Sequence, residues 1–283
     1  MEEAREDFEK QGFGVAGITY DSREVLEFFS DRTGIHYPLL TDPESSIIRE
    51  FGVLNPIFPP GNVGYGMPFP GYFVVDADGT VLSKYFEKKH RQRYSARSIL
   101  TNFLGETGSL QAEINSEHLS LRTYMSDIVA TPGSRVTLVS EIDLEPGVHI
   151  YAPEVTGGYR PTAFVIEEHP LVEIHEPTFP ESRTLHLEVI DEEVPVYEGK
   201  IRILRDITVS SSVLAPRIEL SGYFEFQACD DEECYPPERI PVTFDIQVTP
   251  KDRVRPPEAL WKHGERQIGA PRYKRETFTP PPL

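Results

Sequence analysis

The pattern of apolar residues changes part-way along this chain, and this change constrains the fold more than any other feature. Up to about residue 104, apolar runs that suit buried strands alternate with segments that place apolar residues on one helical face. From about His118 to Val248, short strand-like runs follow one another with turn residues between them. Alternating helix and strand is typical of α/β domains, and a series of short strands is typical of a β-sandwich. The sequence therefore predicts two domains of different class.

The first domain is expected to span residues 1–105, with a polar linker at 106–117, the sandwich at 118–249 and a tail at 250–283. The elements expected in the first domain are strands at 14–20, 72–76 and 80–85, helical faces at 25–29 and 47–51, and helices at 2–11 and 96–103. Asp21 and Ser22 supply capping side chains for the second helix. The strands expected in the sandwich are 136–144, 149–151, 163–166, 185–189, 201–204, 218–226 and 242–248.

Charge and hydropathy exclude several functions. The formal net charge is −18, and binding to nucleic acid needs a basic face that neutralises phosphates. No run of about 20 apolar residues occurs, so the chain is not expected to span a membrane. The tail differs in sign, because Lys251 to Leu283 holds eight Lys or Arg and four Asp or Glu. Such a basic, proline-rich tail predicts a disordered strap, with a docking tail for an acidic partner as the alternative.

The two cysteines of the chain, Cys229 and Cys234, lie together in the segment QACDDEECYPPE. A bridge across so short a loop removes little chain entropy, about 2 kcal/mol in the loop-closure model, so the pair favours redox chemistry over stapling the fold. A strand pattern ends just before Cys229, and Pro236 and Pro237 forbid a regular central strand after Cys234. We therefore expect the pair on an exposed corner within reach of another protein.

The residues between the cysteines set the expected chemistry. Four consecutive carboxylates, residues 230–233, should raise the pKa of both thiols by like-charge repulsion. Thiols of high pKa leave poorly and favour the disulfide, which predicts an electron donor of low reduction potential. A passive hairpin disulfide remains the alternative. Metal binding is disfavoured, because two sulfurs with no histidine nearby make an incomplete site.

The second region resembles the N-terminal domain of the thiol:disulfide interchange protein DsbD. The segments that carry the resemblance are GVHIYAP at 147–153, VYEGK at 196–200 and QACDDEECYPPE at 227–238. It implies an immunoglobulin-like sandwich whose cysteine pair receives electrons from a membrane thiol carrier and passes them to soluble partners. It also implies a cap loop at 190–197, where Val194 and Val196 would shield sulfur. A bacterial periplasmic location is favoured by this resemblance alone, with a cytoplasmic one left open.

The first region resembles the redoxin, or AhpC/TSA peroxiredoxin-like, branch of the thioredoxin fold. The matching stretches are 17–55 and 65–87. The resemblance implies that Pro70 is a cis-proline beside the active site, with an ordinary trans loop proline as the alternative. The family's reactive cysteine would precede Met1, so we expect an incomplete domain without its first strand and nucleophile. Val15, Ile18 and Val74 would then be poorly covered.

These observations predict a thiol–disulfide oxidoreductase, linked to peroxiredoxin-type antioxidant activity, with Cys229 and Cys234 as catalytic residues. Which cysteine attacks first stays open. The expected partners are protein thiols and disulfides, such as a thioredoxin-like protein or a membrane thiol carrier, and neither a metal nor an organic cofactor is expected. The alternative is a non-catalytic interaction module in which a structural disulfide lies beside a degenerate redoxin scaffold.

Overall fold

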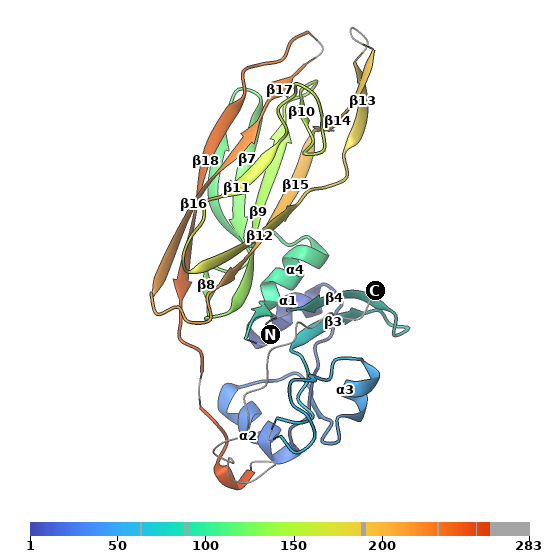
Figure 1. Cartoon of the computed structure of the whole chain (residues 1–283), viewed down its shortest axis with the longest axis vertical. Coiled ribbons are helices and arrows are strands. Elements are labelled where there is room, and N and C mark those ends of the chain that lie inside the picture. Colours follow the sequence, from blue (N-terminus) through green and yellow to red (C-terminus); the bar gives the residue numbers. More distant parts are fainter. Residues whose placement is uncertain are drawn as a thin grey trace. The chain divides into compact units, whose positions relative to one another are not determined.

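The chain forms two compact units, which Figure 1 shows as a mostly β-sheet part and a smaller mixed part. The computed structural model describes residues 1–62, 64–87, 89, 91–187, 191–230, 232–252 and 254–260. The first unit comprises Met1–Ala96 together with Lys251–Leu283, and the second comprises Arg97–Pro250. Among the described residues, no helix has the length and apolar character needed to cross a bilayer.

The first unit contains short helices and two small sheets. Its elements are η1 (Glu2–Ala4), α1 (Arg5–Lys10), β1 (Gly17–Thr19), α2 (Arg23–Thr33), β2 (Leu39–Thr41), α3 (Ser46–Glu50), β3 (Gly71–Val75), β4 (Val81–Phe86), β5 (Arg93–Tyr94) and η2 (Glu258–Leu260). Strands β1 and β2 pair in parallel, whereas β3 and β4 form an antiparallel hairpin, as their sequences predict. The two pairs are separate two-stranded sheets.

Local signals explain where the helices of this unit begin and end. The Ser22 hydroxyl accepts a hydrogen bond from the Val25 amide, which confirms the predicted cap of α2. Gly34 ends α2 with φ of 67°, a conformation that glycine adopts without a steric penalty. The Asp42 carboxylate accepts hydrogen bonds from the amides of Ser46 and Ile48 and thereby fixes the start of α3.

The second unit contains all but the first residue of α4 (Ala96–Leu104) and continues as a β-sandwich. Its strands are β6 (Ser109–Asn115), β7 (Leu119–Met125), β8 (Val129–Ala130), β9 (Ser134–Leu144), β10 (His149–Tyr151), β11 (Ala163–Ile166), β12 (Val172–Thr178), β13 (Arg183–Leu187), β14 (Glu192–Glu198), β15 (Lys200–Val209), β16 (Arg217–Phe226), β17 (Ala228–Cys229) and β18 (Glu238–Val248). The strand orders are β12-β15-β9-β7-β6, β11-β16-β18-β8 and β13-β14-β10-β17. Every strand predicted in this region is present; residues 188 and 189 of one of them lie outside the described residues.

The core of the sandwich explains why its strands pair as they do. Alternate residues of β7 are buried, and β16 shows the same alternation, so each of these strands turns one face inward. Leu138 on β9, Phe224 on β16 and Phe244 on β18 are fully buried in one continuous apolar cluster. Burying such side chains contributes roughly 1.5 to 3 kcal/mol each, which makes this cluster the main stabilising feature of the unit.

The stretch predicted as a linker, 106–117, instead contains strand β6. Leu110, Ala112 and Ile114 alternate with polar residues, and β6 pairs antiparallel with β7 as an edge strand. The prediction was wrong because an edge strand with one solvated face can be mostly polar in sequence. The helix found at 96–104 also belongs to this unit, since the Asn102 side chain donates to Thr137 on β9 at 2.7 Å.

Two further predictions concern Pro70 and the tail. The Phe69–Pro70 peptide bond is trans, so the cis geometry expected for Pro70 is wrong for this structure. An X-Pro bond prefers trans by about 0.5 to 1 kcal/mol, and cis persists only where the surroundings impose it. Here the buried Phe69 donates its amide to Val53, and Gly71 starts β3. Most of the predicted tail, residues 253 and 261–283, lies outside the described residues.

Candidate functional site

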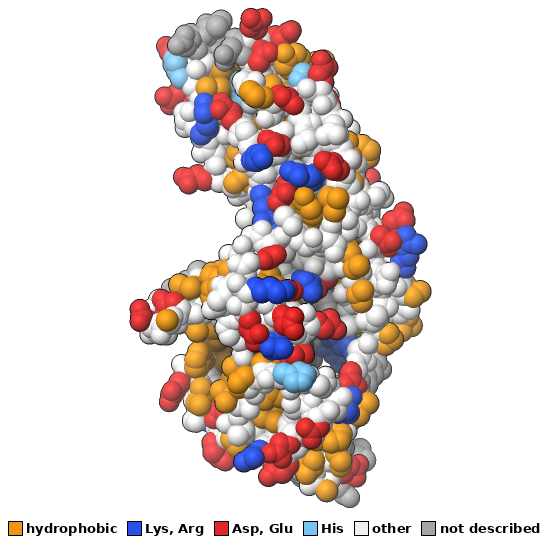
Figure 2. Space-filling model, turned by 180° about the vertical axis from the view of Figure 1, so that it is seen from behind, with side chains coloured by type: hydrophobic (Ala, Val, Ile, Leu, Met, Phe, Trp, Pro, Cys, Tyr) orange, Lys and Arg blue, Asp and Glu red, His pale blue; other side chains and the backbone are white. Residues whose placement is uncertain are grey.

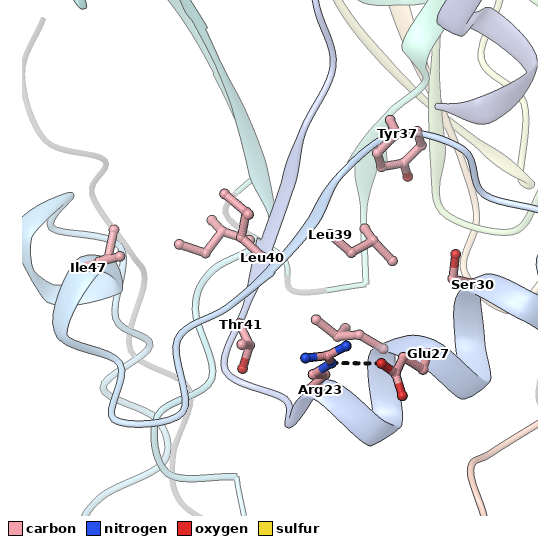
Figure 3. Close-up of a pocket in the computed structure, with 10 residues that line it drawn as sticks. Arg23, Glu27, Ser30, Tyr37, Leu39, Leu40, Thr41 and Ile47 are labelled. Carbon is pink, nitrogen blue, oxygen red and sulfur yellow. Dashed lines mark hydrogen bonds and ion pairs between the residues drawn. The ribbon is translucent and has the colours of Figure 1, made fainter.

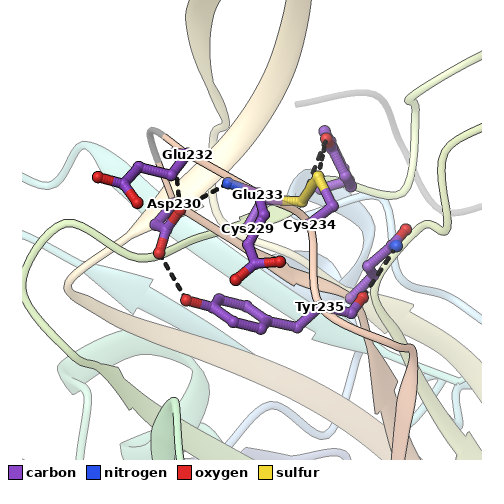
Figure 4. Close-up of a disulfide and its surroundings, with 8 residues drawn as sticks. Cys229, Asp230, Glu232, Glu233, Cys234 and Tyr235 are labelled. Atoms are coloured by element: carbon purple, nitrogen blue, oxygen red, sulfur yellow. Dashed lines mark hydrogen bonds between the residues drawn. A yellow bond between two sulfur atoms is a disulfide. The ribbon is translucent and has the colours of Figure 1, made fainter.

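Cys229 and Cys234 form a disulfide at one end of the sandwich, where β17 follows β16 (Figures 1 and 4). The S–S distance is 2.12 Å and the Cα atoms lie 4.0 Å apart. Cys229 pairs with His149 of β10, and an isolated antiparallel bridge joins Cys229 to Cys234. The two cysteines that the sequence singled out are therefore brought together, whereas Pro70 belongs to the other unit.

The turn between the cysteines is organised by Asp230. Its Oδ1 accepts hydrogen bonds from the amides of Glu232 and Glu233, at 2.8 and 2.9 Å. Its Oδ2 accepts from the Tyr235 hydroxyl at 2.5 Å, and Figure 4 shows this ring reaching back under the turn. The Asp230 amide donates to the Glu233 carbonyl at 3.0 Å. The side-chain carboxylate and the backbone amide of Asp230 thus both form hydrogen bonds that close the turn.

These hydrogen bonds shift the pKa values of both partners. The pKa of Asp230 is lowered from 3.8 to about 2, mainly because the Tyr235 hydroxyl and two amides stabilise the carboxylate. The same hydrogen bond raises the pKa of Tyr235 to about 12. Near neutral pH, Asp230 is therefore a fixed negative charge and Tyr235 a neutral donor.

The two sulfurs differ in exposure. Cys229 is 1% exposed and lies in a small apolar cluster with Tyr151, Val194 and Val196, whereas Cys234 is exposed. The prediction that Val194 and Val196 shield sulfur is confirmed for Cys229. The exposed corner expected for the pair applies to Cys234 alone. The predicted cap loop is mostly strand β14, and its residue 190 lies outside the described residues.

Tyr151 is a site residue that the cysteine spacing did not reveal. Its hydroxyl lies 3.4 Å from each of the two sulfurs, and the ring is 1% exposed. Burial raises the pKa of Tyr151, and the negative charge of Glu192 raises it further, so the hydroxyl stays protonated. Tyr159 packs on this ring with centroids 4.6 Å apart and donates to Glu192 at 2.8 Å. The segment GVHIYAP contained Tyr151, but only the β10–β17 pairing places it beside sulfur.

A second site residue outside the cysteine motif is His118. Its ring stacks on Tyr235 with centroids 4.0 Å apart and planes at 24°, and its exposed fraction is 8%. No sequence signal links the two residues, because they are separated by more than a hundred positions and meet only in the folded sandwich.

The first unit contains no cysteine but has apolar hollows. One of about 560 Å³ lies between α2 and the strands β1 and β2, and Figure 3 shows Leu39 of β2 on the side of Arg23 and Glu27 of α2. Hydrophobic side chains also gather in patches on the surface of this unit (Figure 2). Its exposed large hydrophobic residues are Ile18, Phe29, Leu40, Ile47, Phe51, Val75, Val81, Leu82 and Val254. Ile18 is exposed as expected, whereas Val15 and Val74 are half-buried.

Among the residues that the structure describes, no His, Cys, Asp and Glu side chains gather in groups of three or more that suit a metal ion. The groups that the structure places around the cysteines are the disulfide itself, the Tyr151 hydroxyl and the Asp230–Tyr235 pair.

Two protein families match the two parts of the chain. Residues 1–84 match the AhpC/TSA family, and residues 122–246 match the family described as thiol:disulfide interchange protein DsbD, N-terminal. Both resemblances predicted from the sequence are confirmed. The matches support a general function in thiol–disulfide oxidoreduction and, with the strands described above, an architecture of a redoxin region followed by a DsbD N-terminal-like sandwich.

Two curated relatives have names that agree with the AhpC/TSA match. "Putative peroxiredoxin MT2597" and "Putative peroxiredoxin Rv2521", from two strains of Mycobacterium tuberculosis, are each 32% identical over 83 residues, which is 29% of this chain and 52% of the relative. The chain thus spans about half the length of these curated relatives.

Two solved structures are similar to the chain. One is the N-terminal periplasmic domain of ScsB from Proteus mirabilis, with a TM-score of 0.38, 12% identity, and coverage of 55% of this chain and 57% of that one. The other is the reduced DsbD N-terminal domain of Neisseria meningitidis, with a TM-score of 0.26, 16% identity, and coverage of 39% and 75%. Because these TM-scores are low, the assignment of the second region depends on the family match.

Proposed function

We propose that the sandwich is a thiol–disulfide exchange module whose reactive pair is Cys229 and Cys234. The observation that carries the proposal is the asymmetry of the pair: an exposed Cys234 is joined to a Cys229 that is 1% exposed. An attacking thiolate needs access to one sulfur, and the sulfur it does not attack becomes the leaving group. The exposure of Cys234 supports its role as the sulfur that partners attack and, in the dithiol, as the thiolate that attacks first.

Electrons enter and leave through the same sulfur in this mechanism. A donor thiolate attacks Cys234 Sγ, the S–S bond breaks, and Cys229 leaves as a thiolate that takes a proton. The second donor thiolate attacks the donor sulfur of the mixed disulfide, which releases reduced Cys234 and an oxidised donor. In the second half-reaction the reduced pair passes its electrons on. The Cys234 thiolate attacks an acceptor disulfide, and Cys229 then resolves the mixed disulfide by attacking Cys234 Sγ, which releases the reduced acceptor. Two electrons move in each half-reaction, and no metal or organic cofactor takes part.

Tyr151 supports this chemistry as a hydrogen-bond donor. Its hydroxyl lies 3.4 Å from both sulfurs and is buried, so it is positioned to stabilise negative charge on whichever sulfur becomes a thiolate. Tyr151 is not a proton acceptor here, because burial raises the pKa of its hydroxyl and keeps it protonated.

Trapping of single-cysteine variants tests the proposal. Cys229→Ser leaves the exposed sulfur and is expected to form a stable mixed disulfide with a thioredoxin-like protein that keeps only its attacking cysteine and is supplied as the thionitrobenzoate disulfide, so that Cys234 displaces thionitrobenzoate and no second thiol can resolve the adduct. Cys234→Ser leaves the buried sulfur and is expected to trap far less. Mass spectrometry of non-reduced adducts measures both. Equal trapping would contradict the assigned order. A wild-type disulfide that neither glutathione nor thioredoxin reduces would favour the alternative, an interaction module with a structural disulfide.

We further propose a link between the sandwich and peroxiredoxin-type peroxide reduction. Support comes from the AhpC/TSA match at residues 1–84, which lies in the same chain as the match to the DsbD N-terminal domain. Peroxide consumption by a cysteine-containing peroxiredoxin, measured with the reduced chain as the only electron donor, is expected to stop in a Cys229→Ser, Cys234→Ser double variant. Unchanged consumption would reject the link.

We also propose that the sheet of the first unit is an incomplete thioredoxin-type sheet. Support comes from two separate two-stranded sheets, β1–β2 and β3–β4, and from exposed apolar residues on both, such as Ile18 and Val75. Strand edges with uncovered apolar faces favour pairing with another strand. Fluorescence of a hydrophobic dye on a fragment of residues 1–96 is expected to be high, and dye binding at the level of the isolated sandwich would contradict the proposal.

A further inference from the structure

Several hydrogen bonds close the turn between the cysteines without involving sulfur. The Asp230 carboxylate accepts from the Glu232 and Glu233 amides and from the Tyr235 hydroxyl, and the Asp230 amide donates to the Glu233 carbonyl. None of these bonds needs the S–S bond in order to form. These hydrogen bonds can therefore hold the turn closed when the disulfide is reduced.

Tyr235 is itself held at several points, which fixes the direction of its hydroxyl. Its amide donates to the Ala228 carbonyl at 2.8 Å, and its carbonyl accepts from the Gln227 side chain at 3.1 Å. The ring face packs against His118, which is 8% exposed. A side chain fixed in this way loses little further freedom when it binds Asp230, so its hydrogen bond retains more of its strength.

We propose that Asp230 and Tyr235 are positioning residues that hold the Cys229 and Cys234 thiols together in the reduced protein and thereby lower the reduction potential of the pair. This inference rests on the proposed exchange function and extends it to the side chains that tune it. Reduction normally frees the chain that the disulfide held, and that gain in freedom favours the dithiol. A turn that stays closed in the dithiol removes this gain. The two sulfurs then remain at high effective concentration, and the disulfide is favoured.

The glutathione equilibrium measures this effect directly. One protein disulfide and two molecules of reduced glutathione give one protein dithiol and one molecule of oxidised glutathione, so that two electrons and two protons pass to the protein. A residue that only stabilises the sandwich affects both redox forms alike and leaves this equilibrium unchanged. A residue that holds the turn closed acts mainly on the dithiol, because the S–S bond holds the oxidised form in any case.

The negative charges around the cysteines have a separate effect that the experiment has to exclude. Carboxylates raise the pKa of nearby thiols, and this also favours the disulfide, but only at a pH where thiolates form. At about pH 6, thiols with pKa values near or above the usual 8.5 are protonated in both the wild type and the variants. A shift of the equilibrium that persists at this pH reports on the turn and not on thiolate charge.

The main experiment compares the full chain with its Tyr235→Phe variant in glutathione buffers at about pH 6. Phe keeps the ring that packs on His118 and changes no charge, so only the donor to Asp230 is lost. We expect the equilibrium constant for reduction to rise about tenfold, which is about 30 mV for a two-electron couple. Tyr223→Phe is the matched control, because this ring lies on β16 under the Arg239 guanidinium and away from the turn. It should keep the wild-type value.

A second pair of variants keeps the test decisive if Tyr235→Phe folds poorly. Asp230→Asn and Glu232→Gln each remove one carboxylate from the turn, and of these two described residues it is Asp230 whose side chain accepts hydrogen bonds within the turn. At about pH 6 we expect the larger rise for Asp230→Asn. Equal values for Tyr235→Phe, Asp230→Asn and the wild type would overturn the inference. If the wild-type disulfide resisted glutathione altogether, the proposed function itself would fail, which is a different outcome.

Discussion

Individual side chains around the disulfide have different expected roles, some in the reactivity of the sulfurs and others in the stability of the turn. Tyr151 contacts both sulfurs through its hydroxyl, whereas the Asp230 carboxylate accepts hydrogen bonds from the backbone of the turn. Burial raises the pKa of the first, and hydrogen bonds lower the pKa of the second. One residue is therefore expected to affect the rate of exchange, and the other the stability of the turn.

Tyr151→Phe is expected to slow exchange while leaving the fold intact. Phe keeps the ring that packs against Tyr159 but loses the donor beside the sulfurs. A hydrogen bond to a charged group contributes roughly 1.5 to 3 kcal/mol, so the rate of alkylation of reduced Cys234 should fall about tenfold or more near neutral pH, and its thiol pKa should rise. The pH profile of iodoacetamide labelling measures both. Overlapping profiles for the variant and the wild type would contradict this role.

Asp230 also predicts a particular dependence of stability on pH. Its pKa is lowered from 3.8 to about 2 in the folded protein. The ionised carboxylate therefore stabilises the fold fully at pH values above 3.8, the pKa of the unfolded chain. This contribution is lost as the pH falls through about 2. The melting temperatures of the wild type and of Asp230→Asn should therefore differ near neutral pH and converge towards about pH 2. A difference that stayed constant over this range would show that Asp230 does not act through its charge.

At the scale of the elements, the pairing of β11 with β16 leaves no room for a side chain at Gly222. Gly222 on β16 pairs with Ile166, and a Cβ built at Gly222 would lie 2.1 Å from the Val165 carbonyl oxygen. Backbone cannot move aside as a flexible side chain can. Glycine is therefore required here for strand pairing and not for a turn.

Gly222→Ala is expected to destabilise the sandwich by about 2 kcal/mol or more, because strand β11 has to shift away from β16. Gly158→Ala is the matched control, since a Cβ at this loop position meets no atom within 4 Å. Urea unfolding of both variants, with the disulfide intact, measures the difference. Equal midpoints would show that the strands adjust without cost.

Some elements could be predicted from the sequence, and others could not. The apolar residues that recur along β9, β16 and β18, many of them at alternate positions, allow these strands to be predicted from the sequence. Strand β14 begins with Glu192 and Glu193 and contains Pro195, so its sequence favours a loop, and only pairing with β10 and β13 makes it a strand. In the same way the cysteine pair is evident from spacing, whereas Tyr151 and His118 reach the site only through strand register and packing.

At the scale of the whole molecule, the second unit begins earlier than its strands suggest. Helix α4 is tied to the sandwich by polar contacts: the Ser98 hydroxyl lies 3.1 Å from that of Ser126 and donates to the Arg135 carbonyl, while Asn102 donates to Thr137. Ser98 is fully buried, so these contacts replace lost contacts with water. The sandwich with its helix is therefore the natural unit to isolate.

A fragment of residues 96–250 is expected to fold alone and to keep the exchange activity of the full chain. A fragment of residues 118–250, which lacks α4 and β6, should be less stable. Removal of β6 exposes the edge of β7, and removal of α4 leaves the partners of Ser98 and Asn102 unsatisfied. Urea midpoints and the rate of reduction by dithiothreitol compare the two. Equal midpoints would place the boundary of the unit at residue 118.

The position of the cysteines before β18 has a consequence for biosynthesis. A nascent chain leaves the ribosome from its N-terminus, so both thiols emerge while β18, which pairs with β16 and β8, is still inside the exit tunnel. These 283 residues hold no third thiol with which either cysteine can mispair. Oxidation can thus join the correct sulfurs on an unfinished domain, and within this chain maturation requires no isomerase to reshuffle bonds.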